Sequence, residues 1–467
     1  MNNLKKIFEI NVASCHEIEF DYIVIGSGAA GSSSAITLAE QGYNILVVEA
    51  GPLALTDHVG STSLHYNPEL LKPVSSSYSS YSEWENQNQE KFPSQTWTVA
   101  GGRTLFWGGH SPRFLDSDFE TWPIAANQLK EDYEWAERHL GVNRHFFHNQ
   151  EQENLIKMGQ ESTINLEPSP LAVDAYAGNS RLPHLLFSGI SRLLSSKYFT
   201  ADIQSKGIHL LCDMQAIRLE AGQGHITSLV LEDRLQSHEV RLRAKHYVLA
   251  CGALRSNQLV LNSNLKLEHQ PGTGISEHLF CKGLIRLRQP LTAPVYLHAT
   301  AALDEPYLFE IHGPLGETWY DNNYATVWLD WHKNTQYLLL YGFGVAEINP
   351  DNRVILDNST LGYKVYYQHT PHDIETFSAM ATKAKKIATA LGGSLQKIEF
   401  QPPGMSYHER GGLVMSEEPP NGLVNERGTF WNYKNLHCTD PAIWPSQGAS
   451  NPCLTITAIA RYLMRDR

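Results

Sequence analysis

The sequence predicts an α/β protein that begins with a parallel sheet and adds an antiparallel sheet later in the chain, so that it is α+β overall. The apolar, β-rich run FDYIVI (20–25) leads directly into the glycine turn GSGAAG (26–31). A segment with helical spacing follows, and then a second apolar run, ILVV (45–48), which completes one βαβ unit. Alternating strand-like runs between about 283 and 367, such as TVWLDW and YLLLYGF, indicate the antiparallel sheet.

The glycine turn has the spacing of a dinucleotide-binding loop. Gly26, Gly28 and Gly31 fit G-x-G-x-x-G, in which the first glycine permits the tight turn and the second lets the backbone approach a pyrophosphate. The third allows close packing of helix on strand. Glu49 ends the second strand 49 − 28 = 21 residues after Gly28, where a carboxylate can accept both ribose hydroxyls of an adenosine. The pattern predicts a bound dinucleotide without distinguishing FAD from NAD.

Between residues 60 and 97 the chain is rich in Ser, Tyr, Asn and Gln, and we expect a long surface excursion tethered by Trp84 and Trp97. The glycine-rich stretch AGGRTLFWGG (100–109) follows. Its backbone amides can approach a flat ring or a phosphate because no Cβ obstructs them. Taken alone, the stretch is equally consistent with a surface loop.

Later elements are predicted by similar patterns. Residues 126–140 have the spacing of an amphipathic helix, and AKHYVLACGALRSNQLVL reads as a strand (247–250), a small-residue turn at Cys251 and Gly252, and a helix. We expect further helices over 373–391 and from Cys453 onward.

Composition excludes several classes of function. The net charge is -12 and no long basic run is present, so we expect no nucleic-acid partner. No stretch approaches the length of about 18 apolar residues that a membrane span needs, and Glu9 and Asn11 interrupt the apolar stretch that a signal peptide would need. Six cysteines without a C-x-x-C pair argue against thiol redox chemistry and a cysteine zinc site. We expect no metal and, by default, a cytoplasmic enzyme.

Two polar residues near the C-terminus are candidates for catalysis. His408 lies in SYHERGGLVM, with strand-like flanks and paired glycines, and Asn451 precedes Pro452 and the closing helix. His408 is also one of 21 histidines, most of which need only a satisfied hydrogen bond. Asn451 could equally be a helix cap, since Asn-Pro favours one.

The sequence as a whole resembles a known family. Six motifs occur in order across nearly the whole chain: FDYIVIGSGAAG…VVEAGP, AGGRTLFWGG, AKHYVLACGALRSNQLVLNS, GVAEINPDNRVIL, YH-x-x-G-G-x-x-M and TDPAIWPSQGASNPCLTITAIA. Together they resemble the glucose–methanol–choline (GMC) family of FAD-dependent oxidoreductases, in a short version closer to the cholesterol oxidase and sugar dehydrogenase branches. The resemblance implies a Rossmann-like FAD-binding domain joined to a discontinuous second domain built on an antiparallel sheet. We expect the first from residues 18–110, 200–282 and 425–467, and the second, which would bind substrate, from 111–199 and 283–424.

The resemblance also implies where FAD is bound. Gly26–Gly31 would hold the pyrophosphate and Glu49 the ribose, Gly101–Gly109 would run beside the isoalloxazine, and the backbone of Ala216 would meet the adenine. The residues expected to contact FAD are Gly26, Ser27, Gly28, Ala30, Gly31, Glu49, Ala50, Gly101, Gly102, Arg103, Thr104, Trp107, Gly108, Gly109, Ala216, Ala250, Cys251, Gly252, Asp440, Pro441, Pro452, Leu454 and Thr455. Phe106 occupies the place where some members carry a histidine bonded to the flavin, so we expect FAD to be non-covalent.

In this family His408 would be the active-site histidine and Asn451 the second member of the pair. Oxidising an alcohol removes a hydroxyl proton and a carbon-bound hydride, the latter to flavin N5. A histidine over the ring can accept the proton, and such a base contributes about 10²–10⁴ in rate. Asn451 can hydrogen-bond the same oxygen and fix which hydrogen faces the flavin. We therefore expect oxidation of a CH–OH group in a small-molecule alcohol, with oxygen or another carrier as electron acceptor.

This chain departs from the family pattern at several positions. Gly412 replaces the more common threonine and Ser416 the last glycine of the motif that contains His408. His110, just beyond the glycine-rich stretch, is a candidate for a flavin or substrate contact, although we expect a surface or structural role for it. Two alternatives follow: an FAD-containing lyase of the hydroxynitrile type, or a catalytically impaired flavin-binding homologue. The substrate is not predicted.

Overall fold

A six-stranded sheet gathers the two ends and the middle of the chain. The computed structural model describes residues 8–62, 68–173, 187–299, 305–315, 335–358 and 361–467. The strands of this first sheet are, in spatial order, β22 (Thr429–Phe430), β23 (Tyr433–Cys438), β12 (Ala244–Leu249), β1 (Phe20–Ile25), β2 (Ile45–Val48) and β8 (Ile208–Leu211). All neighbours pair in parallel except β22, which is antiparallel at one edge. The predicted parallel sheet is confirmed.

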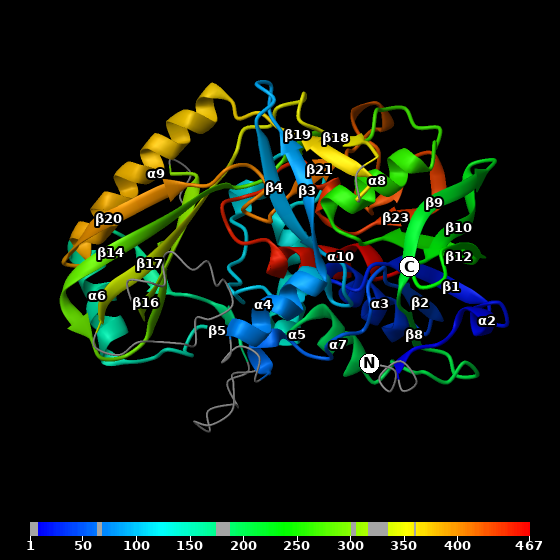
Figure 1. Ribbon diagram of the computed structural model, residues 1–467, viewed down its shortest axis with the longest axis horizontal. Coiled ribbons are helices and arrows are strands. Elements are labelled where there is room, and N and C mark those ends of the chain that lie inside the picture. The colour runs from blue at the N-terminus through cyan, green and yellow to red at the C-terminus, as the bar shows by residue number, and fades with distance from the viewer. Residues whose placement is uncertain (1–7, 63–67, 174–186, 300–304, 316–334, 359–360) are drawn as a thin grey trace.

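Small residues let the helices approach this sheet and one another. Helix α3 (Ala29–Glu40) follows the glycine turn and packs against α10 (Cys453–Met464) and α7 (Gly189–Leu194), while α10 also packs against α5 (Lys130–Leu140). The N-terminal strands and α10 therefore lie together in Figure 1, at the opposite ends of the colour scale. The helix predicted from Cys453 is confirmed, and that predicted over 126–140 begins as a 3₁₀ turn before α5.

A three-stranded antiparallel sheet adjoins the first sheet. It contains β9 (Met214–Gly222), β10 (His225–Asp233) and β11 (His238–Leu242), with β10 in the middle. Helix α8 (Ala253–Asn262) follows β12 and packs against β9. The strand, small-residue turn and helix predicted around Cys251 and Gly252 are thus present as β12 and α8.

A second six-stranded sheet stands between the two sides of the molecule (Figure 1). Its order is β21 (Arg410–Gly412), β13 (Thr273–Ser276), β18 (Arg353–Leu356), β19 (Tyr363–Tyr366), β3 (Ser79–Glu85) and β4 (Lys91–Trp97). The predicted surface excursion is therefore wrong for residues 79–97, which form a hairpin of this sheet. Trp84 is 0% exposed and its ring lies 5.3 Å from that of Tyr367, because the alternate positions Ser82 and Trp84 of β3 face inward.

The third large sheet is wholly antiparallel. Its order is β20 (Gly393–Phe400), β14 (Leu279–Leu291), β17 (Thr335–Gly344), β16 (Tyr307–Leu315), β15 (Val295–Ala299) and β6 (Leu166–Pro168). Helices α9 (Pro371–Ala390) and α6 (Gln150–Glu161) pack against it and bury Met380 and Leu155 in its core (Figure 1). The antiparallel sheet and the helix near 373–391 are confirmed. YLLLYGF lies in β17, whereas TVWLDW lies outside the described residues.

The remaining elements are short. They are α2 (Val12–Cys15), α4 (Pro68–Ser77), the paired β5 (Val142–Asn143) and β7 (Leu171–Ala172), and the 3₁₀ turns η1 (Val59–Ser61), η3 (Gly102–Leu105), η4 (Asp116–Phe119), η5 (Ala126–Leu129), η8 (Pro419–Asn421) and η9 (Pro441–Ile443). None of the helices in the described part of the chain has the length and apolar character needed to cross a membrane.

Candidate active site

The glycine turn is held in shape by backbone contacts that only glycine allows. Gly26 has φ +105°, and a Cβ there would lie 2.5 Å from the carbonyl oxygen of Ala250. A Cβ on Gly31 would lie 1.9 Å from the carbonyl oxygen of Gly26. These two glycines therefore serve the tight turn and the packing of α3 on β1, as the sequence predicts.

Ser27 links the turn to the second glycine-rich stretch. Its hydroxyl donates to Oε2 of Glu49 (2.6 Å) and accepts from the backbone N–H of Gly101 (2.8 Å). Glu49 also accepts from the backbone N–H groups of Ser27 (3.1 Å) and Gly51 (2.9 Å). Burial raises the pKa of Glu49, and these hydrogen bonds oppose that effect. One carboxylate oxygen thus braces the glycine turn and the other the backbone after β2, and the predicted contact of Glu49 with a ribose stays a prediction.

The two segments predicted to lie near the adenosine of FAD are neighbours in the structure. The backbone N–H of Met214 donates to the carbonyl of Glu49 (3.0 Å), and that of Asp213 donates to Gly51 (3.1 Å). This places the start of β9, which contains the half-buried Ala216, beside the half-buried Ala50.

Glycines from three segments leave room for an elongated ligand. A Cβ added to Gly102, Gly108 or Gly252 would meet nothing within 4 Å, and one added to Gly28 would meet only the carbonyl oxygen of Gly101, at 3.9 Å. In contrast to Gly26 and Gly31, these glycines are not required by packing of the protein on itself. Backbone free of Cβ is what a pyrophosphate and a flat ring need for close approach. The residues present therefore fit FAD.

Asp440 joins two of the predicted cofactor segments. Its Oδ2 accepts from the backbone N–H of Gly252 (3.0 Å) and the hydroxyl of Ser256 (2.5 Å), and its Oδ1 accepts from the backbone N–H of Ala442 (2.9 Å). Asp440 thus fixes the turn after β12 against η9, which begins at Pro441.

Other predicted contact residues are used mainly by the protein itself. Thr104 accepts from the backbone N–H of Gly189 (2.7 Å), Trp107 donates from its indole to the carbonyl of Phe187 (2.8 Å), and Thr455 is bonded to the hydroxyl of Tyr133 (2.8 Å). Those that are buried are Ala30, Thr104, Gly109, Ala250, Pro452, Leu454 and Thr455. Trp107 and Cys251 are half-buried. Contact of any of them with FAD stays a prediction.

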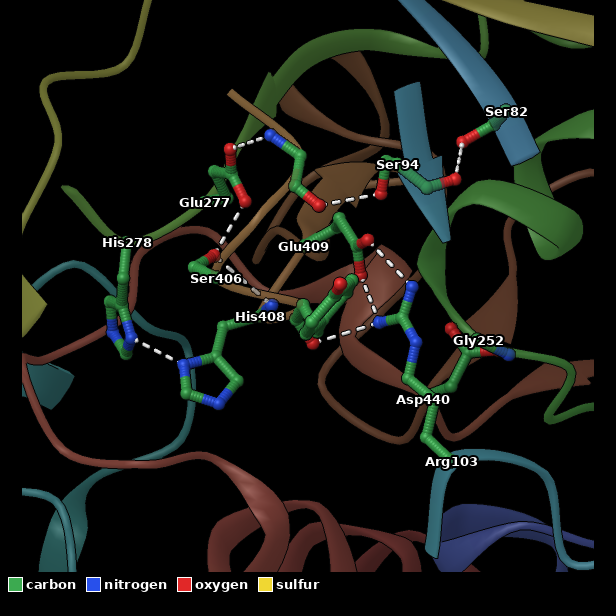
Figure 2. Close-up of polar contacts among 12 residues, drawn as sticks. Ser82, Ser94, Arg103, Gly252, Glu277, His278, Ser406, His408, Glu409 and Asp440 are labelled. Carbon is green, nitrogen blue, oxygen red and sulfur yellow. Dashed lines mark hydrogen bonds and ion pairs between the residues drawn. The ribbon is translucent and has the colours of Figure 1, made fainter. Parts of the chain in front are cut away.

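Arg103 clamps the two residues that flank His408 (Figure 2). Its guanidinium forms a two-pronged ion pair with Glu409, with Nη2 2.7 Å from Oε1, and Nη1 donates to the carbonyl of Tyr407 (2.8 Å). Tyr407 has φ +60°, a left-handed conformation that a non-glycine residue adopts only when its surroundings impose it. The clamp therefore holds the turn that presents His408.

Glu277, the residue that follows β13, supports the same segment. It accepts from the backbone N–H of Gly404 and from the hydroxyl of Ser406 (2.5 Å). Burial raises its pKa to about 8, with the nearby Glu409 adding to the rise. Ser94 of β4 donates to the carbonyl of Gly404 (2.5 Å), so the hairpin 79–97 also helps to position the segment (Figure 2).

Removing the Arg103 guanidinium should destabilise the protein. Glu409 has a side chain only 3% exposed, so Arg103→Met leaves a buried carboxylate without its partner. We expect the free energy of unfolding to fall by about 1.5–3 kcal/mol, the range for hydrogen bonds to a charged group. Urea unfolding measures this. Adding Glu409→Gln should restore part of the loss because it removes the unpaired charge, and a double variant no more stable than the single variant would contradict this role.

His408 is half-buried and neutral. Its Nδ1 lies 2.8 Å from Nδ1 of His278, and the ring of Phe343 packs 5.1 Å from its own. Burial, together with the nearby His278, Arg103 and His110, holds the pKa of His408 well below its usual value. At neutral pH the imidazole is therefore available as a proton acceptor.

Asn451 is oriented by a buried histidine and carboxylate. Its Oδ1 lies 3.0 Å from Nδ1 of His110, which also lies 2.9 Å from Oε1 of Glu310. Burial raises the pKa of Glu310, but His110 and the hydroxyl of Tyr296 outweigh it and hold that pKa at about 2. An ionised carboxylate only accepts, so His110 donates from Nδ1 to Glu310 and Asn451. The Nδ2 amide of Asn451 remains to donate elsewhere.

Two interpretations from sequence are corrected here. His110 is 3% exposed and bonded to Asn451, so a surface role for it is wrong. Asn451 does not cap the closing helix, because the cap residue of α10 is Pro452 and no side chain bonds there.

One loop connects the two candidate catalytic residues. With its amide nitrogen facing His408, Gln447 donates to the carbonyl of His408 (3.2 Å) and accepts from the backbone N–H of His278 (3.2 Å). Gly448, three residues before Asn451, accepts from Nε2 of His278 (2.6 Å). The structure therefore brings His408 and Asn451 to the same loop, 447–451.

Four residues that support the candidate catalytic pair escaped the sequence analysis: Glu277, His278, Glu310 and Glu409. Glu409 could have been suspected as a charged neighbour of His408. The others carry no local signal, because the pairing of distant strands alone brings them to the site.

Family models match most of the chain. The model described as FAD dependent oxidoreductase matches residues 21–276, and the model described as GMC oxidoreductase matches residues 350–460. With the parallel sheet and the glycine-lined space, these matches define an FAD-dependent oxidoreductase. The chain belongs to the GMC oxidoreductases and has non-covalent FAD as its cofactor.

Relatives match along nearly their whole length. The chain is 25% identical to 6'''-hydroxyparomomycin C oxidase of Streptomyces lividus, over 96% of this chain and 92% of that protein. It is also 25% identical to paromamine 6'-oxidase of Streptomyces fradiae, over 94% of this chain and 90% of the relative. Pyridoxine 4-oxidase from Mesorbium loti has a similar fold, with a TM-score of 0.71 at 16% identity, covering 96% of this chain and 98% of the other.

Proposed function

We propose that His408 is the general base and Asn451 the orienting residue in the oxidation of a primary alcohol group on a polar, sugar-like substrate. The observation that carries the proposal is the neutral imidazole of His408 beside the loop that presents Asn451. FAD, when bound, supplies the acceptor for the hydride that leaves the carbinol carbon. All other steps belong to side chains of this chain.

The two residues contact the substrate oxygen in complementary ways. Neutral His408 accepts the hydroxyl proton as the carbon–hydrogen bond breaks, which avoids an unstable protonated aldehyde. Asn451 has its Oδ1 bonded to His110, so its Nδ2 donates to the same oxygen and turns the carbinol hydrogen toward the flavin.

Polar groups behind Asn451 support a polar substrate. Glu310, His298 and His312 are each less than 5% exposed and lie on β15 and β16, facing His110 and Tyr296. The two aligned Streptomyces relatives are named 6'''-hydroxyparomomycin C oxidase and paromamine 6'-oxidase. We accordingly propose a sugar-like alcohol, with oxygen or another carrier as acceptor.

The domain organisation and location are part of the same proposal. Residues 18–110, 200–282 and 425–467 would form the FAD-binding domain, and 111–199 and 283–424 the substrate-binding domain. All six cysteines are free, which supports a reducing, cytoplasmic location.

The rate of turnover should fall at acidic pH because the proposed base becomes protonated. Protonated His408 cannot accept the hydroxyl proton, so kcat/KM should fall as pH drops through its pKa and stay level above it. Because the pKa of His408 is lowered, the acid limb should lie below the usual histidine value of about 6.5. A kcat/KM profile between about pH 4 and 9 measures this. An acid limb centred above about pH 7 would contradict a neutral, half-buried base.

A panel of alcohols tests the proposed reaction. Primary alcohols, sugars, amino sugars and sterols are mixed anaerobically with the holoenzyme, and bleaching of the flavin is recorded. We expect bleaching by hydroxylated sugars or amino sugars, followed by peroxide on admission of air if oxygen is the acceptor. Aldehyde release from a cyanohydrin without bleaching would favour the lyase, and a flavin that no alcohol bleaches would favour the impaired homologue.

A further inference from the structure

A buried histidine, His278, contacts His408 but takes no direct part in the proposed reaction. His278 is the residue before β14 and is 2% exposed. Its ring points at His408 (Figure 2). The two rings are nearly perpendicular, with centroids 4.9 Å apart and the two Nδ1 atoms 2.8 Å apart. Phe343 packs against both rings, at 5.8 Å from His278 and 5.1 Å from His408.

The protonation of both rings follows from one backbone carbonyl. The carbonyl oxygen of Gly448 only accepts, so Nε2 of His278, 2.6 Å away, carries a hydrogen and donates it. Burial lowers the pKa of His278 to about 4, although the bond to Gly448 opposes this, so the ring is neutral and holds that single hydrogen. Its Nδ1 then carries a lone pair, which accepts a hydrogen bond from Nδ1–H of His408.

We propose that His278 is a positioning residue that fixes His408 in the tautomer with a lone pair on Nε2. The inference rests on the proposed role of His408 as base. In the other tautomer the hydrogen would sit on Nε2 of His408, and two lone pairs would face each other across 2.8 Å. The contact therefore selects one tautomer of His408. The hydrogen bond made by its Nδ1 leaves its Nε2 free to accept a proton.

The proton balance of the step is simple. Nε2 of His408 gains the hydroxyl proton of the substrate, and the ring becomes an imidazolium. Its Nδ1–H stays directed at the lone pair of His278, whose Nε2–H stays on Gly448. His278 ends the step neutral, and its contribution is to orient His408 and to stabilise the imidazolium.

Two substitutions of similar size separate this role from packing. In the FAD-loaded enzyme, His278→Asn keeps an oxygen that can accept from Nδ1–H of His408, whereas His278→Leu removes the acceptor. We expect the rate of anaerobic flavin reduction at saturating alcohol to fall about 10- to 100-fold in His278→Leu, part of the effect of a general base. Binding of FAD and the substrate Kd should hardly change, and His278→Asn should recover most of the rate.

The outcomes are distinct. Equal rates in His278→Leu and the wild type, or equally slow rates in His278→Asn and His278→Leu, would overturn the inference while leaving His408 as base. An undiminished rate in His408→Ala would instead overturn the proposed function. If His278→Leu does not retain FAD, His278→Phe keeps a ring against Phe343 without nitrogen and serves in its place, with the same loss expected and an undiminished rate again decisive against the inference.

Discussion

Replacing His408 with alanine is expected to lower the rate of anaerobic flavin reduction by about 10²–10⁴, the usual contribution of a general base. The physical reason is that the hydroxyl proton then has no acceptor as the hydride leaves. FAD content should be unchanged, because His408 is held from behind by Arg103, Glu277 and His278 rather than by the glycines that would receive the cofactor. Stopped-flow bleaching measures the rate.

The matched control for this variant is His408→Asn, which keeps a polar group of smaller size but supplies no base. We expect it to be as slow as His408→Ala. If either variant oxidised its alcohol at the wild-type rate, the assignment of the base would be wrong.

Replacing Gly31 with alanine is expected to prevent normal folding of the nucleotide-binding turn. The new Cβ would lie 1.9 Å from the carbonyl oxygen and 2.8 Å from the carbonyl carbon of Gly26, and backbone atoms cannot move aside as a side chain can. Helix α3 would have to shift from β1, at a cost of about 3 kcal/mol, the upper end for overpacking. Urea unfolding of the purified protein and its flavin content measure the result.

The control is Gly28→Ala in the same turn. Its Cβ would meet only the carbonyl oxygen of Gly101, at 3.9 Å, so the stability of the FAD-free protein should change by no more than about 0.5 kcal/mol. The affinity for FAD should fall about tenfold or more, equivalent to about 1.4 kcal/mol, because the Cβ projects where the pyrophosphate is expected. Unchanged affinity would place the pyrophosphate elsewhere.

Local patterns were enough to predict the parts of the fold that are local. The βαβ unit, the turn at Cys251 and Gly252 and the closing helix follow from hydrophobic periodicity and glycine spacing over a few tens of residues. The hairpin 79–97 was missed because its polar composition is unusual for a strand that buries Trp84. Its place in the sheet depends on pairing with β19, nearly 300 residues later.

The candidate site also has parts that local sequence patterns predict and parts that they do not. Sequence motifs pointed to His408 and Asn451, but not to the groups that set their chemistry. His278 and Glu310 reach the site through β14 and β16 of the antiparallel sheet. His110 was expected at a surface or in a structural role, because nothing in the sequence shows that Glu310 lies 2.9 Å from its ring. Such contacts follow from register between strands, which one-dimensional patterns do not specify.

The most direct test of the account is a single-turnover experiment with an alcohol deuterated at the carbinol carbon. The holoenzyme is mixed anaerobically with labelled and unlabelled substrate, and flavin bleaching and aldehyde formation are followed together. If the carbinol hydrogen passes to flavin as His408 accepts the proton, both signals rise in step and both are slowed by deuterium. Aldehyde formed while the flavin stays oxidised, or bleaching indifferent to deuterium after substrate has bound, would contradict it.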